Sequence, residues 1–153
     1  MRKVSFLVLL MLVISLSAPA MAGEPGRYSY VTIESVNITV LDFNKAGFEV
    51  DYSVDENVQF LVLLLGKGDL KDKLSEIFGY DDYTFDNVDM DHASFKVNIR
   101  SYNNGDGTYW FPEQKFKIEI PNITIQAQDN YKIFPQVKDF PGIGYYVNPQ
   151  DEK

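Results

Sequence analysis

The densest group of residues that could do chemistry is a run of five aspartates near the middle of the chain. Carboxylate oxygens gathered on a turn are the ligands that Ca²⁺ prefers. An EF-hand loop, however, alternates its ligands around a central glycine and ends on a glutamate, and this run does neither. We therefore favour a solvated acidic turn, predict no cofactor, and keep a Ca²⁺-stabilised structural domain as an alternative. The weak metal-ligand candidates are Asp81, Asp82, Asp86, Asp89 and Asp91.

The single histidine, His92, directly follows this run and is the side chain best suited to acid–base work near neutral pH. Together with Asp89 and Asp91 it is the best candidate for the centre of a secreted hydrolase that uses carboxylates. A serine hydrolase would also need its nucleophile on a recognisable turn, and the sequence contains no G-x-S-x-G motif. We therefore predict no catalytic residues and a protein that is not an enzyme, with such a hydrolase as the alternative.

Charge and cysteine content exclude further classes of function. The chain has 153 residues, with 14 Lys and Arg against 22 Asp and Glu, a net charge of -8 and no cysteine. Sequence-independent binding to nucleic acid rests on a basic face, so nucleic acid is not an expected partner. Without cysteine the chain can form no disulfide, no thiolate metal site and no cysteine nucleophile.

A hairpin in the second half of the chain carries the candidate binding residues. Residues 103–107 read NNGDG and predict a tight turn, because Asn-Gly and Asp-Gly tolerate positive φ. A two-residue turn, combined with the alternation around Phe116, turns Trp110 toward the core and the residues on either side of it outward. Exposed aromatic rings flanked by cations can stack on sugars or anchor a partner protein. The predicted contacts are Tyr102, Tyr109, Phe111, Arg100 and Lys117.

Two features of the sequence leave an alternative orientation of this hairpin open. The Tyr- and Phe-rich C-terminal segment could cover the face, which would make these rings ordinary core. Pro112 could also add a bulge and reverse the orientation of the residues before it.

The first 22 residues have the pattern of a secretory signal peptide. Arg2 and Lys3 precede an apolar run from Val4 to Leu16, and Ala20-Met21-Ala22 supplies a small-x-small cleavage site. The run is about 13 residues long, shorter than the ~20 that cross a bilayer as a helix. We expect a secreted or extracytoplasmic protein that can associate with the cell envelope and has no stable transmembrane span after cleavage. An uncleaved N-terminal anchor is the alternative.

Two N-x-T motifs make Asn37 and Asn122 candidates for glycosylation in an exported protein. Both asparagines lie on the polar side of their local hydrophobic alternation, so a glycan would meet solvent.

Hydrophobic alternation predicts mostly short strands. The clearest spans 48–54, where every second residue is apolar. A longer strand, 28–42, changes phase at Glu34-Ser35, which predicts a β-bulge. A helix is predicted over 69–78, with Asp69 as its N-cap and Gly79 at its C-terminal end. The other expected strands span 58–65, 83–88, 93–101, 109–120 and 122–126.

Together these elements predict an all-β protein, namely an antiparallel β-sandwich, immunoglobulin-like or similar, of about seven strands with one short crossover helix. It would form a single domain over 23–153, and its last part, 131–153, is predicted to be irregular because it is rich in proline and glycine. We expect a non-enzymatic module that binds an envelope polysaccharide or a partner protein through the hairpin face. Fold analogy supports this function, since sandwiches host binding more often than catalysis.

Overall fold

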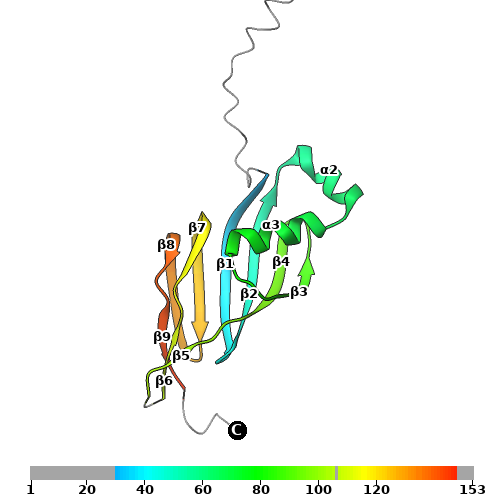
Figure 1. Cartoon of the computed structure of the whole chain (residues 1–153). Helices are drawn as coiled ribbons and strands as arrows, with labels where there is room; N and C mark the ends of the chain where they lie inside the picture. Colours follow the sequence, from blue (N-terminus) through cyan, green and yellow to red (C-terminus); the bar gives the residue numbers. More distant parts are fainter. Residues whose placement is uncertain (1–29, 106, 148–153) are drawn as a thin grey trace, which may run out of the picture.

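The computed structural model describes residues 30–105 and 107–147, so the predicted signal segment 1–22 lies outside the described residues. Strands predominate, and two helices lie between the second and third strands of the described part (Figure 1). The elements are β1 (Val31–Asp42), β2 (Lys45–Val54), α2 (Glu56–Leu65), α3 (Gly68–Phe78), β3 (Tyr83–Val88), β4 (His92–Asn98), β5 (Tyr102–Asn103), β6 (Thr108–Phe111), β7 (Gln114–Ala127), β8 (Asn130–Phe140) and β9 (Ile143–Tyr146).

The larger sheet has six strands in the order β3-β4-β2-β1-β7-β8. Its neighbours are antiparallel except β1 and β7, which run parallel, so the predicted purely antiparallel arrangement is wrong at this one pairing. The parallel pairing is possible because more than seventy residues separate the two strands, which leaves ample chain for a crossover. The predicted bulge in the first strand is confirmed, because the β1–β2 register shifts between Ile33 and Ser35.

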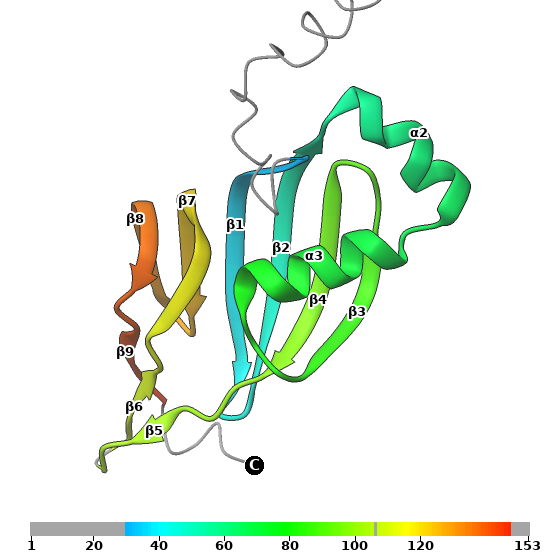
Figure 2. The same cartoon turned by 45° about the horizontal axis from the view of Figure 1, so that its top comes forward.

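Helix α3 packs on one face of this sheet and closes the core there. It crosses in front of β2 and β4 (Figure 2). Phe78, near its C-terminal end, is fully buried, and its ring centroid lies 5.9 Å from that of Phe48, 5.5 Å from Phe95 and 5.7 Å from Phe116. These three rings come from β2, β4 and β7, so one helix residue joins three strands of the sheet.

The prediction of this helix is confirmed, and so is its C-terminal end. Gly79 adopts the left-handed conformation, with φ 68°, and its N–H donates to the carbonyl of Ser75. The predicted N-cap is wrong, because the helix begins one residue earlier, at Gly68, and Asp69 lies inside its first turn. There the carboxylate accepts a hydrogen bond from the hydroxyl of Tyr30 instead of capping the helix.

Residues 58–65, predicted to be a strand, belong to helix α2. Apolar residues fill both parities of this segment, a pattern that a short buried strand and a short helix share. Capping hydrogen bonds at both ends of the segment distinguish the helix from a strand. The Asp55 side chain caps its first turn by accepting from the N–H of Asn57, and the N–H of Gly66 donates to the carbonyl of Val62 at its last turn.

The last part of the described chain is regular, which corrects the prediction of an irregular tail. β8 is the edge strand of the larger sheet, where a proline such as Pro135 is tolerated because one side of the strand needs no ladder partner. Pro121, which separates the expected strands 109–120 and 122–126, lies inside β7 at a stretch where the β7–β8 register shifts. β9 pairs with β6 and belongs to the smaller sheet, of three strands in the order β5-β6-β9.

Of the predicted fold, the mostly-β character is confirmed. The described part of the chain has nine strands instead of about seven, arranged in two open sheets, with a helix over the face of the larger one. The predicted single helix is two helices in the described part of the chain.

Candidate functional site

The smaller sheet gathers the exposed aromatic side chains of the hairpin on one of its faces. Tyr102 of β5 pairs with Trp110 of β6, and Trp110 pairs in turn with Gly144 of β9. Thr108, two residues before Trp110, pairs with Tyr146. Paired residues, and residues two apart along one strand, point to the same face of a sheet. The three aromatic residues therefore share one face.

We call this surface, made by Tyr102, Trp110 and Tyr146, the aromatic face. The side chains are 61%, 40% and 54% exposed respectively. Large aromatic side chains that stay this open on one face of three neighbouring strands are typical of binding sites.

The opposite face of the smaller sheet is core. Tyr109 is 7% exposed and stacks on Phe43 at a centroid distance of 4.2 Å. Phe111 is 1% exposed and meets Phe140 edge to face at 5.9 Å. The predicted outward orientation of Tyr109 and Phe111, and the inward orientation of Trp110, are therefore wrong.

The reason for this error lies at Pro112 and Glu113, which belong to no strand and separate β6 from β7. Phe111 and Phe116 are both buried although they are an odd number of positions apart, so the alternation that places Phe116 in the core is not carried back across these two residues to Trp110. The turn also contributes. The N–H of Asn104 donates to the carbonyl of Thr108, so the loop between these two residues has three residues instead of the expected two.

Two glycines position the ring of Trp110. A Cβ atom at Gly144 would lie 3.3 Å from Cε3 of the indole, and one at Gly142 would lie 2.7 Å from its Nε1. These indole atoms are on opposite edges of the ring, so the ring lies across the backbone of β9 and the turn before it, with its other side toward solvent. Gly142 also has φ +76°, which an L side chain rarely adopts.

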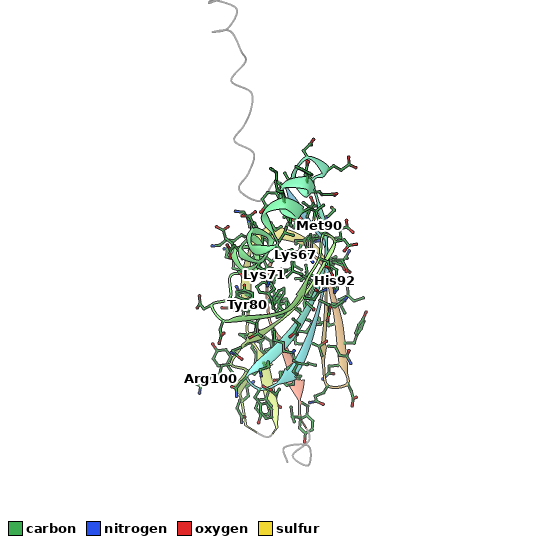
Figure 3. All side chains as sticks on the ribbon, turned by 90° about the vertical axis from the view of Figure 1, so that its right-hand side faces the viewer. Lys67, Lys71, Tyr80, Met90, His92 and Arg100 are labelled. Atoms are coloured by element: carbon green, nitrogen blue, oxygen red, sulfur yellow. The ribbon has the colours of Figure 1, made fainter. Side chains whose placement is uncertain are left out.

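The remaining predicted contacts are only partly in place. Arg100 is exposed two residues before Tyr102 and lies toward the end of the molecule that carries the smaller sheet (Figure 3). Lys117 is exposed on β7 and so belongs to the larger sheet. Tyr146 was missed because it falls in the segment predicted to be irregular. Its signal was the alternation of Ile143, Tyr145 and Val147 with small or polar-tipped residues.

The run of aspartates does not converge on one point. Asp82 and Asp86 accept from Asn98 and Lys96 of β4, whereas Asp89 accepts from Lys67, which lies between α2 and α3. The Lys67 ammonium and the Asn87 amide beside Asp89 hold the pKa of that carboxyl below its usual range. Asp81 and Asp91 are exposed. Among the residues that the structure describes, no group of three His, Cys, Asp or Glu side chains is placed to hold a metal ion.

His92 lies between two carboxylates of β2 rather than among its sequence neighbours. Its Nδ1 is 2.9 Å from Oδ1 of Asp51, and its Nε2 is 2.8 Å from Oε2 of Glu49. The hydrogen bond to Asp51, followed by that to Glu49, raises the pKa of His92. Hydrogen bonds from His92 and Ser35 lower the pKa of Asp51. Both ring nitrogens are engaged by carboxylates, an arrangement that favours the charged imidazolium over a free base.

The two candidate glycosylation sites lie on the face of the larger sheet away from α3. Asn37 and Asn122 are exposed, on the neighbouring strands β1 and β7. Asn37 pairs with Thr124, the threonine of the second motif, so the two motifs lie side by side. Glycosylation of either asparagine stays a prediction.

None of the helices in the described part of the chain has both the length and the apolar character needed to span a membrane. No protein-family model, curated protein or solved structure matches the chain.

Proposed function

We propose that this protein is an exported, non-enzymatic binding module that holds a polysaccharide of the cell envelope on its aromatic face. The observation that supports this proposal is the placement of Trp110, whose ring rests across β9 and is flanked by the open rings of Tyr102 and Tyr146. A fixed ring with an accessible side is suited to stacking on the apolar face of a sugar ring.

The sheet beneath these rings supports a site of fixed shape. Trp110 is on the central strand of the three, and its neighbours on β5 and β9 are held by ladder pairing. Buried contacts on the opposite face, between Tyr109 and Phe43 and between Tyr109 and Tyr145, tie the sheet to the core. Side chains held in this way lose little conformational freedom when a ligand binds.

The charge of the chain favours a neutral ligand. With a net charge of -8, the protein repels polyanions, and the aromatic face itself contains no ionisable group other than its tyrosine hydroxyls. A neutral glycan offers hydroxyl groups to these hydroxyls and to Thr108, which lies on the same face.

Export by the predicted signal peptide is part of this proposal, because an envelope polysaccharide lies outside the cytoplasm. In this view the smaller sheet presents the ligand-binding surface and the larger sheet supports it, as in a sandwich-type binding domain. No closer kinship with immunoglobulin-like domains is proposed.

The single tryptophan makes the experiment direct, because all indole fluorescence of the chain comes from Trp110. The protein is titrated with soluble oligomers of neutral wall glycans, namely β-linked glucose and N-acetylglucosamine chains. Stacking of a sugar on the ring should shift the emission maximum and saturate with concentration. Gly144→Val, which pushes the ring away from β9, and Tyr102→Ala should each weaken binding at least about tenfold, or 1.4 kcal/mol.

Retention on insoluble polysaccharide and on isolated cell envelopes gives a second measurement of binding. It can also be applied to Trp110→Ala, which has no tryptophan left for the fluorescence titration. The matched control is Tyr131→Ala, since Tyr131 is 65% exposed on β8 of the other sheet. The control should bind as the native protein does, and all variants should keep their thermal melts. Retention on envelopes that survives glycan digestion and is lost on protease treatment would overturn the proposal in favour of a protein ligand. An equal loss of binding in Tyr131→Ala would overturn the assignment of the site to the aromatic face.

A further inference from the structure

Helix α2 exposes its apolar side chains instead of burying them. Phe60, Leu61, Leu63 and Leu64 are 68%, 49%, 70% and 68% exposed, whereas Val62 is buried. At 100° per residue the four exposed side chains fall on one arc of the helix, opposite Val62. Their open surface is on the order of a few hundred Å², the size at which exposed apolar patches on a monomer are often functional.

This apolar arc lies where the chain enters the described part of the molecule. The carbonyl of Tyr30, the first described residue, accepts from the N–H of Asp55, which is the N-cap of α2. The Tyr30 hydroxyl donates to Asp69 at the start of α3. Figure 2 shows α2 beside the start of β1, at the end of the molecule away from β5 and β6.

We propose that α2 docks on a lipid bilayer, lying in the plane of the membrane interface with Phe60, Leu61, Leu63 and Leu64 in the acyl region. The sequence before Tyr30 is the argument for this occupant. It holds the apolar run Val4 to Leu16, which brings the chain to a membrane during export and holds it there for as long as the run stays attached. Residues 17–29 separate that run from Tyr30 and reach at most about 45 Å when fully extended, so α2, whose N-cap is hydrogen-bonded to Tyr30, lies within that reach of the membrane that holds the run.

The chemistry of the helix fits an interfacial position. Ten residues make a helix about 15 Å long, too short to span the bilayer and long enough to lie along its surface. The polar residues Glu56 and Asn57 are in its first turn, and Lys67 follows its last turn, so the apolar arc is bounded by polar groups at both ends. Because the opposite side of the helix, at Val62, is buried in the protein, the side that α2 presents to a membrane surface is the apolar arc.

Charge selects the kind of lipid surface. α2 contains no basic residue in its last turn, and the nearby ammonium of Lys67 is paired with Asp89 at 2.5 Å. Interfacial helices that bind anionic lipid carry Lys and Arg on their polar face, and this one does not. Docking therefore rests on apolar burial, and a zwitterionic bilayer of phosphatidylcholine is a sufficient partner.

A second copy of the chain is a poorer occupant of the same arc. A stable dimer buries about 800 Å² on each partner, and four side chains on one short helix supply only part of that area. A bilayer needs no complementary shape, and each inserted side chain contributes independently.

The test uses the absence of cysteine in the chain, which lets one introduced cysteine carry an environment-sensitive dye. Full-length Leu63→Cys, labelled with a nitrobenzoxadiazole dye, is mixed with phosphatidylcholine vesicles. We expect a severalfold rise in emission, a blue shift, and quenching by lipids that carry a quencher in the acyl chain. The matched control is Asn104→Cys, exposed in the β5–β6 turn at the other end of the molecule, whose dye should stay in water.

A second comparison excludes a contribution from the N-terminal segment alone. A dye at Leu61→Cys should no longer be quenched by the lipid quencher when the chain also carries Leu63→Gln and Leu64→Gln. The same dye should still be quenched when the chain instead carries Tyr131→Gln and Ile133→Gln, which change two side chains of similar exposure on β8. The proposal is overturned if the dye on α2 stays in water while the chain is bound to vesicles. It is also overturned if the dye is shielded without vesicles as protein concentration rises, which would identify a second copy. No glycan is present, so the outcome is independent of the aromatic face.

Discussion

Tyr102 and Trp110 face each other across the β5–β6 ladder, and both are open to solvent. Their neighbours along β6, Tyr109 and Phe111, are buried on the opposite face. One residue of register thus separates the rings that can meet a ligand from the rings that hold the smaller sheet to the core.

Truncation should separate these two roles. Phe111→Ala removes a ring that is 1% exposed and packs against Phe140, so the free energy of unfolding should fall by about 3–5 kcal/mol. Tyr102→Ala removes a ring that is 61% exposed and should cost under about 1 kcal/mol. Urea unfolding of the two variants measures the difference. Equal losses of stability would contradict the assignment of the faces.

The strands and the helix that carry a strong period could be predicted from the sequence. β2 alternates strictly, α3 has a one-sided stripe ending at Gly79, and both are present as expected. α2 was missed because its apolar residues follow no period, although Asp55 and Gly66 at its ends are capping residues. Nothing in residues 60–64 shows that they stay exposed, since exposure depends on what the rest of the chain covers.

The candidate site could be predicted only in part. The hairpin and its aromatic content follow from the NNGDG turn, but the orientation of Trp110 depends on the break at Pro112, whose geometry the sequence does not specify. The partners of His92 illustrate the same limit. Oδ1 of Asp51 on β2 lies 2.9 Å from Nδ1 of His92 on the paired strand β4, whereas Asp91, which precedes His92 in the chain, is exposed.

The His92 cluster should make stability depend on pH. Its partners raise the pKa of His92 above the ordinary 6.5, so its contribution is complete below 6.5 and is lost as pH rises through the folded-state value. The pKa of Asp51 is lowered from 3.8, so its contribution is present above 3.8 and is lost as pH falls. Between these limits both contributions are present, so this cluster should stabilise the protein most at mildly acidic pH.

Urea unfolding at about pH 5.5 and about pH 8.5 measures this effect on the histidine side. The two ion pairs are well exposed to solvent, so the loss at the higher pH should be about 0.2–1 kcal/mol for each. His92→Gln should remove most of the difference between the two pH values. Lys67→Gln, which breaks the exposed pair with Asp89 and leaves His92 and its two carboxylate partners in place, should keep it. An unchanged pH dependence in His92→Gln would refute the assignment.

Two neighbouring tyrosines should respond in opposite ways to loss of the hydroxyl. Tyr80 Oη is buried and, among the described residues, has no hydrogen-bond partner. Tyr83 Oη accepts from the N–H of Tyr80 and donates to the carbonyl of Ser75, at the end of α3. Burying an unpaired polar group opposes folding, whereas removing a paired hydroxyl leaves its partners unsatisfied.

Tyr80→Phe should therefore raise the free energy of unfolding by about 1 kcal/mol, because the ring keeps its contact with Phe48 and only the unpaired oxygen is removed. Tyr83→Phe should lower it by about 1–3 kcal/mol, since the Tyr80 N–H loses its partner and the Ser75 carbonyl keeps only the N–H of Gly79. Parallel urea titrations of the two variants give both signs against one native reference. If Tyr80→Phe destabilises the protein as much as Tyr83→Phe does, the buried hydroxyl of Tyr80 has a hydrogen-bond partner, and the assignment of opposite roles to the two hydroxyls is wrong.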